Sequence, residues 1–297
     1  MTSKEMLNQL LDQHYQNAIE AKQQGKLVAW ATSISPQELL ETMDIAVVYP
    51  ENHAAAIGAR KCALELLEHS ESNGYSTDIC SYARVNLGYM EVLESPAGNI
   101  PLPDLIFCCN NICNTVLKWY ENIAKELNIP MILIDLPFNH EYEVTEQNVR
   151  YIRGQLSDAI KQLEKLTERS FDYEKFHEIM KISSETAGWW KKASLMARAK
   201  PSPLNGFDLF NYMAVIVCMR GRKEGLELFK LWVRELEERK AAGLGPWKDQ
   251  EEKIRILWDG IACWPYLSAT YKTLKKYGIN LVASTYPDSW TILYEAG

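Results

Sequence analysis

Two of the seven cysteines stand where the chain pattern predicts the start of a helix. Cys113 opens an amphipathic stretch and follows Asn110 and Asn111, which could cap that helix, and Cys80 has Asp78 as a possible cap. The free amides and the dipole at a helix N-terminus favour a thiolate, which is the form of cysteine that binds metals. Cys80 and Cys113 are therefore candidate ligands, with inert buried thiols as the alternative.

The other five cysteines are weaker candidates for metal ligands. Cys108 and Cys109 alternate along an apolar strand, so at least one must face a covering helix, and we expect both to be structural with Cys109 as a reserve ligand. Cys62 and Cys218 fall on apolar helix faces and are expected in the core. Cys263, in a loop before Trp-Pro, is the most ambiguous. The sequence holds no Cys-x-x-Cys pair.

A carboxylate and a hydroxyl form the second candidate group. Glu51 follows one predicted strand in the stretch Tyr-Pro-Glu-Asn-His, and Ser33 follows another just before a helix start. Because open α/β sheets bind ligands outside the carboxyl ends of their strands, both side chains could reach a substrate. The structural alternatives are a first-turn acid that complements the helix dipole and an ordinary turn serine.

Strands and helices alternate along the first half of the chain and would position these residues. A helix start is expected at Ser35, with Pro36 in the first helical position and Glu38 completing a capping box. Continuous apolar strands that alternate with helices are typical of a parallel sheet covered on both faces. The predicted strands are 27–33, 45–50, 104–109 and 131–137, and the predicted helices include 4–25, 53–72 and 113–128.

The second half is mainly helical before the strand pattern returns. Residues 145–240 read as helices with breaks at 169–170 and 201–206, and a strand–helix–strand pattern follows from residue 253. The segments 27–51 and 254–288 resemble each other in a strand tryptophan, a proline that opens a helix, and a Tyr-Pro-acid ending. This similarity fits either an internal duplication or the general pattern of any two βαβ units.

These patterns predict an α/β protein with two Rossmann- or flavodoxin-like parallel-sheet domains joined by a helical region. When Pro287 is aligned with Pro50, the chain ends at the counterpart of residue 60, so we expect the second domain to be incomplete. The expected parts are an N-terminal helix at 1–25, a first α/β domain with the candidate cysteines at 26–160, a helical connector at 161–250, and the beginning of a second α/β domain at 251–297.

Composition limits the classes of function. The 297 residues include 39 acidic and 32 basic side chains, a net charge of −7, which argues against nucleic-acid binding. No apolar run approaches the roughly 20 residues that a membrane span needs, and the polar N-terminus does not resemble a signal peptide. We therefore expect a cytoplasmic protein with reduced cysteines. The sequence also lacks the phosphate-binding motifs GxGxxG and GxxxxGK[ST].

Seven stretches, in order along nearly the whole chain, resemble the 2-hydroxyacyl-CoA dehydratase family. The resemblance is closest to the α subunits of the lactoyl-CoA and 2-hydroxyisocaproyl-CoA enzymes, and benzoyl-CoA reductase subunits are more distantly similar. The stretches are SISPQEL, VVYPENHAAAIGARK, GYSTDICSYARVNLGYME, CCNNICNTVLKWYENIAKELNIP, IDLPFNH, PSPLNGFDLFNYMAVIV and WDGIACWPYL.

The resemblance implies a cofactor and partners. Family members form a heterodimer with a homologous β subunit, and each subunit holds a [4Fe–4S] cluster through three cysteines. Cys80 and Cys113 match the first two ligands, while the third belongs to a later motif that this sequence does not contain. Ser33 and Glu51 match residues beside the substrate. A separate ATP-hydrolysing iron–sulfur activator supplies one electron.

The resemblance also implies a reaction. An (R)-2-hydroxyacyl-CoA substrate would lose water to give a 2-enoyl-CoA through a ketyl radical, as in anaerobic amino-acid fermentation. Glu51 would be either the base for the β-proton or the acid for the departing hydroxyl, and Ser33 a hydrogen-bond donor to the substrate. A benzoyl-CoA reductase-type subunit and a cluster-free scaffold subunit are the alternatives. The acyl group stays open among lactoyl, hydroxyisocaproyl and phenyllactyl.

Overall fold

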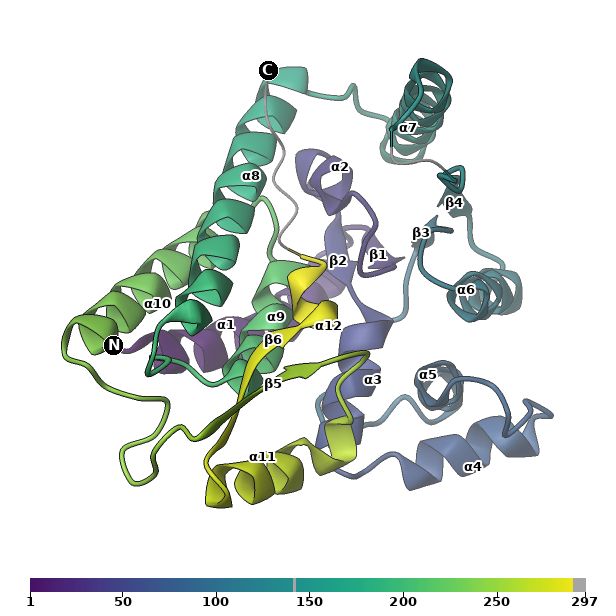
Figure 1. Ribbon diagram of the computed structural model, residues 1–297. Coiled ribbons are helices and arrows are strands. Elements are labelled where there is room, and N and C mark those ends of the chain that lie inside the picture. Colours follow the sequence, from purple (N-terminus) through teal and green to yellow (C-terminus); the bar gives the residue numbers. More distant parts are fainter. Residues whose placement is uncertain (141–142, 291–297) are drawn as a thin grey trace. The chain divides into compact units, whose positions relative to one another are not determined.

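The structure is a computed structural model that describes residues 1–140 and 143–290 (Figure 1). The chain divides into two compact units. The first unit consists of residues 14–177, and the second combines residues 1–13 with the described residues from 178 onward. Helix α1 (Ser3–Gln23) begins in the second unit and ends in the first, and α8 (Tyr173–Leu195) begins in the first and ends in the second.

The first unit contains a four-stranded parallel sheet. Its strands β1 (Val28–Ala31), β2 (Ala46–Val48), β3 (Leu105–Cys109) and β4 (Met131–Ile134) lie in the order β2-β1-β3-β4. Every residue of β1 and β3 is buried, as expected for a parallel sheet covered on both faces. The prediction of a parallel α/β sheet is confirmed here. The strand order reverses between β1 and β3, which makes their carboxyl ends the switch point of the sheet.

Helices pack against this sheet from the connections between its strands. Helix α2 contacts β2, α6 contacts β3 and α7 contacts β4, while α4 and α5 lie side by side (Figure 1). The core between them holds large buried rings, among them Trp30, Tyr89 and Tyr120. The helices are α2 (Gln37–Thr42), α3 (Pro50–Ala59), α4 (Leu64–Ser72), α5 (Ser81–Val92), α6 (Asn114–Leu127) and α7 (Glu146–Thr167).

The local predictions for the helix at 53–72, for Cys62 and for Pro36 are wrong. The single helix predicted at 53–72 is two helices, α3 and α4, because the chain turns at Lys61, whose φ of 58° is left-handed. Cys62 lies in this break, not on a helix face, and its thiol donates to the Ile57 carbonyl at 3.4 Å. Helix α2 begins at Gln37, so Pro36 is its N-cap residue and not its first helical residue.

The second unit contains a two-stranded parallel sheet, β5 (Ile254–Trp258) and β6 (Ile279–Ser284). Phe207, Phe210 and Leu281 are buried at its core, and the Trp258 ring meets both phenylalanines edge-on. The helical breaks predicted at 169–170 and 201–206 are confirmed. The further helices are α9 (Gly206–Cys218), α10 (Lys223–Ala241), α11 (Leu267–Lys276) and α12 (Thr285–Asp288), with short 3-10 helices η1 (Met196–Arg198) and η2 (Trp264–Tyr266).

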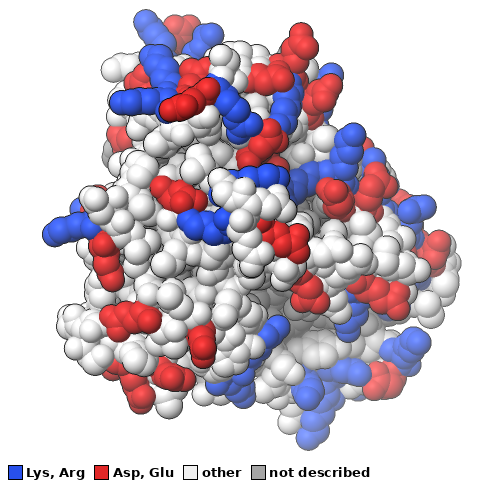
Figure 2. All heavy atoms as spheres, turned by 180° about the vertical axis from the view of Figure 1, so that it is seen from behind, with Lys and Arg blue, Asp and Glu red and all other residues white. Residues whose placement is uncertain are grey.

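The structure thus shows a mixed α/β protein with two parallel sheets, and the predicted domain boundaries and incomplete second domain stay predictions. None of the helices within the described ranges has both the length and the apolar character that a membrane span requires. On the face seen in Figure 2, basic and acidic side chains are interspersed, so their fields partly offset one another there.

Candidate functional site

Ser33 and Glu51 meet at the carboxyl ends of two neighbouring strands. Trp30 in β1 pairs with Val48 in β2, Ser33 lies two residues beyond β1, and Glu51 lies in the first turn of α3. The Ser33 backbone N–H donates to Glu51 Oε2 at 2.5 Å, and the Ser33 hydroxyl donates to the same oxygen. The two oxygen-bearing side chains that the sequence predicts separately therefore form one hydrogen-bonded pair at this edge of the sheet.

The surroundings of this pair make the Glu51 carboxyl easy to protonate. Burial raises the pKa of Glu51 from its ordinary 4.5 to about 7, although the two hydrogen bonds from Ser33 act in the opposite direction. The buried Tyr120 lies close enough to interact with Glu51 electrostatically, and its hydroxyl donates to the Ala31 carbonyl at 3.1 Å. Near neutral pH Glu51 populates both its acid and its carboxylate, as a group that transfers protons in catalysis must.

Cys80 and Cys113 are the N-cap residues of α5 and α6, and both are exposed. Cys113 Sγ accepts a hydrogen bond from the Val116 backbone N–H at 3.4 Å. The helices that carry the two thiols are joined by the Trp119 indole, which donates to the Asn86 side-chain oxygen at 2.8 Å. Both thiols therefore stand at a helix N-terminus, and the Cys113 thiol also accepts a backbone hydrogen bond there.

The expectation that asparagine and aspartate cap these two helices is wrong. Each cysteine occupies the N-cap position itself, so Asn111 and Asp78 lie outside the helices. Asn110 has a different partner set: its side-chain amide donates to Asp135, and its side-chain oxygen accepts from the Leu136 N–H at 2.8 Å.

The remaining cysteines offer little for a metal site. Cys108 and Cys109 are buried in β3, and burial raises the pKa of Cys108 to about 12, which keeps it a thiol. Cys218 is buried at the end of α9, and Cys263 is exposed at the start of η2 in the second unit. Across residues 1–140 and 143–290, no three or more His, Cys, Asp or Glu side chains are grouped to hold a metal ion.

The two cysteines are therefore the right type of ligand for an iron–sulfur cluster, but they are too few to hold one alone. Cys80 and Cys113 have the right chemistry, because iron–sulfur clusters are held by cysteine thiolates. Two thiols are fewer than the three or four ligands that such a cluster takes, and the described part of the chain supplies no complete group.

Asn110 links two strand ends, a role that the sequence does not reveal. Its partner Asp135 follows β4 directly, and the Tyr151 hydroxyl from α7 donates to the other Asp135 oxygen at 2.5 Å. The sequence signal is weak: Asn110 comes immediately after the predicted strand 104–109, and Asp135 is the acidic residue within the otherwise apolar predicted strand 131–137.

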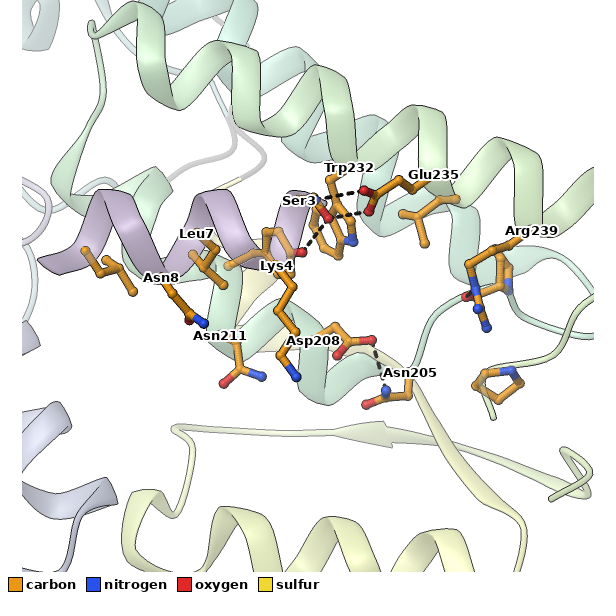
Figure 3. Close-up of a pocket in the computed structure, with 15 residues that line it drawn as sticks. Ser3, Lys4, Leu7, Asn8, Asn205, Asp208, Asn211, Trp232, Glu235 and Arg239 are labelled. Atoms are coloured by element: carbon orange, nitrogen blue, oxygen red, sulfur yellow. Dashed lines mark hydrogen bonds between the residues drawn. The ribbon is translucent and has the colours of Figure 1, made fainter. Parts of the chain in front are cut away.

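A cavity of about 570 Å³ lies in the second unit, lined by α9, α10 and the start of α1 (Figure 3). Its acidic side chains accept hydrogen bonds at the starts of helices. Glu235 accepts from the Ser3 N–H at 2.8 Å and from the Ser3 hydroxyl, which is 2.7 Å from the Tyr212 hydroxyl. Asp208 in the first turn of α9 accepts from the Asn205 side-chain amide at 2.9 Å. Because these carboxylates satisfy helix N-termini, we assign the cavity no chemistry.

Comparison with known proteins places this chain in a family. Residues 32–295 match the family model described as 2-hydroxyglutaryl-CoA dehydratase, D-component. The (R)-2-hydroxyisocaproyl-CoA dehydratase alpha subunit of Clostridioides difficile is 52% identical over 291 residues, which are 98% of this chain and 71% of that protein.

Two further relatives are nearly as similar. The (R)-phenyllactyl-CoA dehydratase alpha subunit of Clostridium sporogenes is 49% identical over 99% of this chain and 72% of its own length. The lactoyl-CoA dehydratase subunit alpha of Anaerotignum propionicum is 46% identical over 100% of this chain and 73% of its own length. The family resemblance inferred from the sequence is confirmed, and the chain belongs to the 2-hydroxyglutaryl-CoA dehydratase D-component family.

Proposed function

We propose that this chain is the α subunit of a 2-hydroxyacyl-CoA dehydratase, a hydro-lyase that converts a 2-hydroxyacyl-CoA into a 2-enoyl-CoA and water. The names of relatives that share 46–52% of their residues with it support this function. The single structural observation that carries the proposal is the Glu51–Ser33 pair, a proton-transfer group at the edge of the sheet where ligands bind. The subunit acts in a complex with a β subunit.

Elimination of water requires two proton transfers. A proton must leave the β-carbon, and the hydroxyl on the α-carbon must depart as water. We assign both tasks to the Glu51 carboxyl, because its pKa of about 7 lets the carboxylate accept the β-proton and the acid protonate the departing oxygen. The Ser33 N–H and hydroxyl orient the Glu51 carboxyl from one side, which leaves its other oxygen for the substrate.

We assign Cys80 and Cys113 as two ligands of a [4Fe–4S] cluster whose further ligand lies outside the described residues. When bound, such a cluster would supply one-electron chemistry: the thioester carbonyl reduced to a ketyl radical anion can expel the α-hydroxyl, and the β-hydrogen of the radical that remains is acidic enough for an ordinary base. The electron would come from a separate ATP-dependent iron–sulfur activator. These assignments are supported by the exposure of both thiols and by their helix N-terminal positions.

Serine replacements test the ligand assignment. We expect Cys80→Ser and Cys113→Ser each to lower the iron content of the anaerobically reconstituted complex and its brown absorption, because serine is a poor ligand for iron–sulfur clusters. Cys263→Ser is the matched control, since Cys263 is also exposed but is not a proposed ligand, and it should keep full iron. Normal iron content in both test variants would rule out the assignment.

Substrate assays test the reaction itself. The complex should release water from at least one of lactoyl-CoA, 2-hydroxyisocaproyl-CoA and phenyllactyl-CoA, and the ratio of kcat/KM among them should identify the acyl group. Net reduction of an aromatic thioester without water loss from any of these substrates would instead indicate a benzoyl-CoA reductase-type subunit.

A further inference from the structure

The side chain of Asn110 links the carboxyl ends of β3 and β4. Its amide donates to Asp135 Oδ1, and its oxygen accepts from the Leu136 N–H at 2.8 Å, so one side chain uses both a donor and an acceptor. From α7, the Tyr151 hydroxyl donates to Asp135 Oδ2 at 2.5 Å. We call Asn110, Asp135 and Tyr151 the Asn110 clamp.

The clamp occupies the carboxylate of Asp135, the residue directly after β4. Each Asp135 oxygen already accepts a hydrogen bond, one from Asn110 and one from Tyr151, and the Asp135 backbone N–H donates to Gln155 at 3.2 Å. A carboxylate that accepts hydrogen bonds on both oxygens in this way is suited to fixing the positions of its neighbours.

The clamp lies at one end of a very short segment whose other end is Cys113. Only Asn111 and Ile112 separate Asn110 from Cys113, and both are exposed. At the far end, Cys113 Sγ accepts from the Val116 N–H at 3.4 Å, and its carbonyl accepts from the Leu117 N–H at 3.5 Å. The position of the thiol therefore depends on the Asn110 clamp and on the first turn of α6.

We propose that the Asn110 clamp is a positioning device for Cys113: it ties the segment 110–113 to the end of β4 and thereby holds the thiol at the N-terminus of α6. The proposal rests on the function assigned above, in which Cys113 is a cluster ligand. It adds three positioning residues, which act through Cys113.

A reciprocal exchange of the two polar partners provides the sharpest test. In Asn110→Asp, the donor to Asp135 becomes a second carboxylate, so the two groups repel each other. In Asp135→Asn, two amides face each other and one donor loses its acceptor. The double variant Asn110→Asp with Asp135→Asn restores a donor and an acceptor in reversed order and preserves the acceptors for the Leu136 N–H and the Tyr151 hydroxyl.

Amide hydrogen exchange on the cluster-free chain reads out the thiol position. The Val116 and Leu117 amides bond to Cys113, and the Arg84 amide bonds to the carbonyl of Cys80 at 3.2 Å, which makes it the matched control at the other cysteine. We expect Asn110→Asp to accelerate exchange at Val116 and Leu117 by about fivefold, the effect of one lost hydrogen bond, with Arg84 unchanged. The double variant should return both rates to the wild-type values.

The proposal is overturned if Val116 and Leu117 exchange at wild-type rates in Asn110→Asp, if the double variant fails to restore them, or if Arg84 accelerates equally. Iron content of the reconstituted complex separates this proposal from the function on which it rests. Loss of iron in Cys113→Ser but full iron in Asn110→Asp would refute the positioning role alone. Full iron in Cys113→Ser would refute the ligand assignment and leave the exchange result as its own test of the clamp.

Discussion

Glu51→Gln should lower the rate of water elimination by about 10²- to 10⁴-fold, the usual contribution of general acid–base catalysis. It should also make the first unit more stable above pH 7. The amide keeps an oxygen that can accept from the Ser33 N–H and hydroxyl, so the local hydrogen bonds survive. It cannot take up or release a proton. The activity is measured as enoyl-CoA formation by the complete complex.

The stability gain follows from the direction of the Glu51 pKa shift. The folded protein holds a proton on Glu51 up to a pKa of about 7, whereas the unfolded chain releases it near 4.5. Between these values the folded state binds more protons, so the free energy of unfolding falls as pH rises through this window. A shift of this size corresponds to about 3 kcal/mol in the free energy of unfolding. The wild-type protein loses this stability as pH rises to 7 and above, whereas Glu51→Gln keeps it because the amide does not ionise.

Exchange of the buried β1 amides measures this effect in the first unit alone. The stability difference between Glu51→Gln and wild type should be small at pH 5 and large at pH 8. Ser33→Ala is the companion variant: it removes one hydrogen bond that favours the carboxylate, so the pKa of Glu51 should rise further. An equal stability difference at both pH values would mean that burial does not destabilise the ionised carboxylate of Glu51.

The sequence predicts the sheet well because its strands carry a strong local signal. Continuous apolar runs mark all four strands of the first unit, and Ser33 and Glu51 are selected as candidates because they stand where two of these runs end. Their direct contact is not predictable locally, because it requires β1 and β2 to be neighbours in the sheet. The hydrogen bond between Asn110 and Asp135 is not predictable for the same reason, because it requires β3 and β4 to be paired in the sheet.

The break between α3 and α4 is not predicted from the sequence for a different reason. Chain reversals are usually marked by glycine or proline, whereas this one uses Lys61 in a left-handed conformation. The cysteine N-caps are equally hard to foresee, since serine, threonine, aspartate and asparagine are the usual N-cap residues. Both positions depend on tertiary packing, which places α4 against α5 and the two thiols at helix ends.

That packing makes Gly88→Ala the most damaging small substitution expected in the first unit. Gly88 lies in α5 at its crossing with α4, and an added Cβ would overlap the backbone carbonyl oxygen of Leu66. A backbone atom cannot rotate away as a side chain can, so the two helices must separate. The buried contacts of α4 and α5 would loosen, and the free energy of unfolding should fall by about 3 kcal/mol.

Gly154→Ala is the matched control for this change. Gly154 also lies within a helix, α7, but nothing stands within 4 Å of an added Cβ there, so alanine should stabilise the helix by about 0.5 to 1 kcal/mol. Opposite signs for the same substitution, measured by exchange of the β1 amides, would show that close helix packing and not helix propensity governs Gly88. Because α5 starts directly after Cys80, Gly88→Ala should also lower iron retention by the complex, which Gly154→Ala should leave unchanged. A Gly88→Ala protein as stable as wild type would mean that α4 and α5 do not pack this closely in solution.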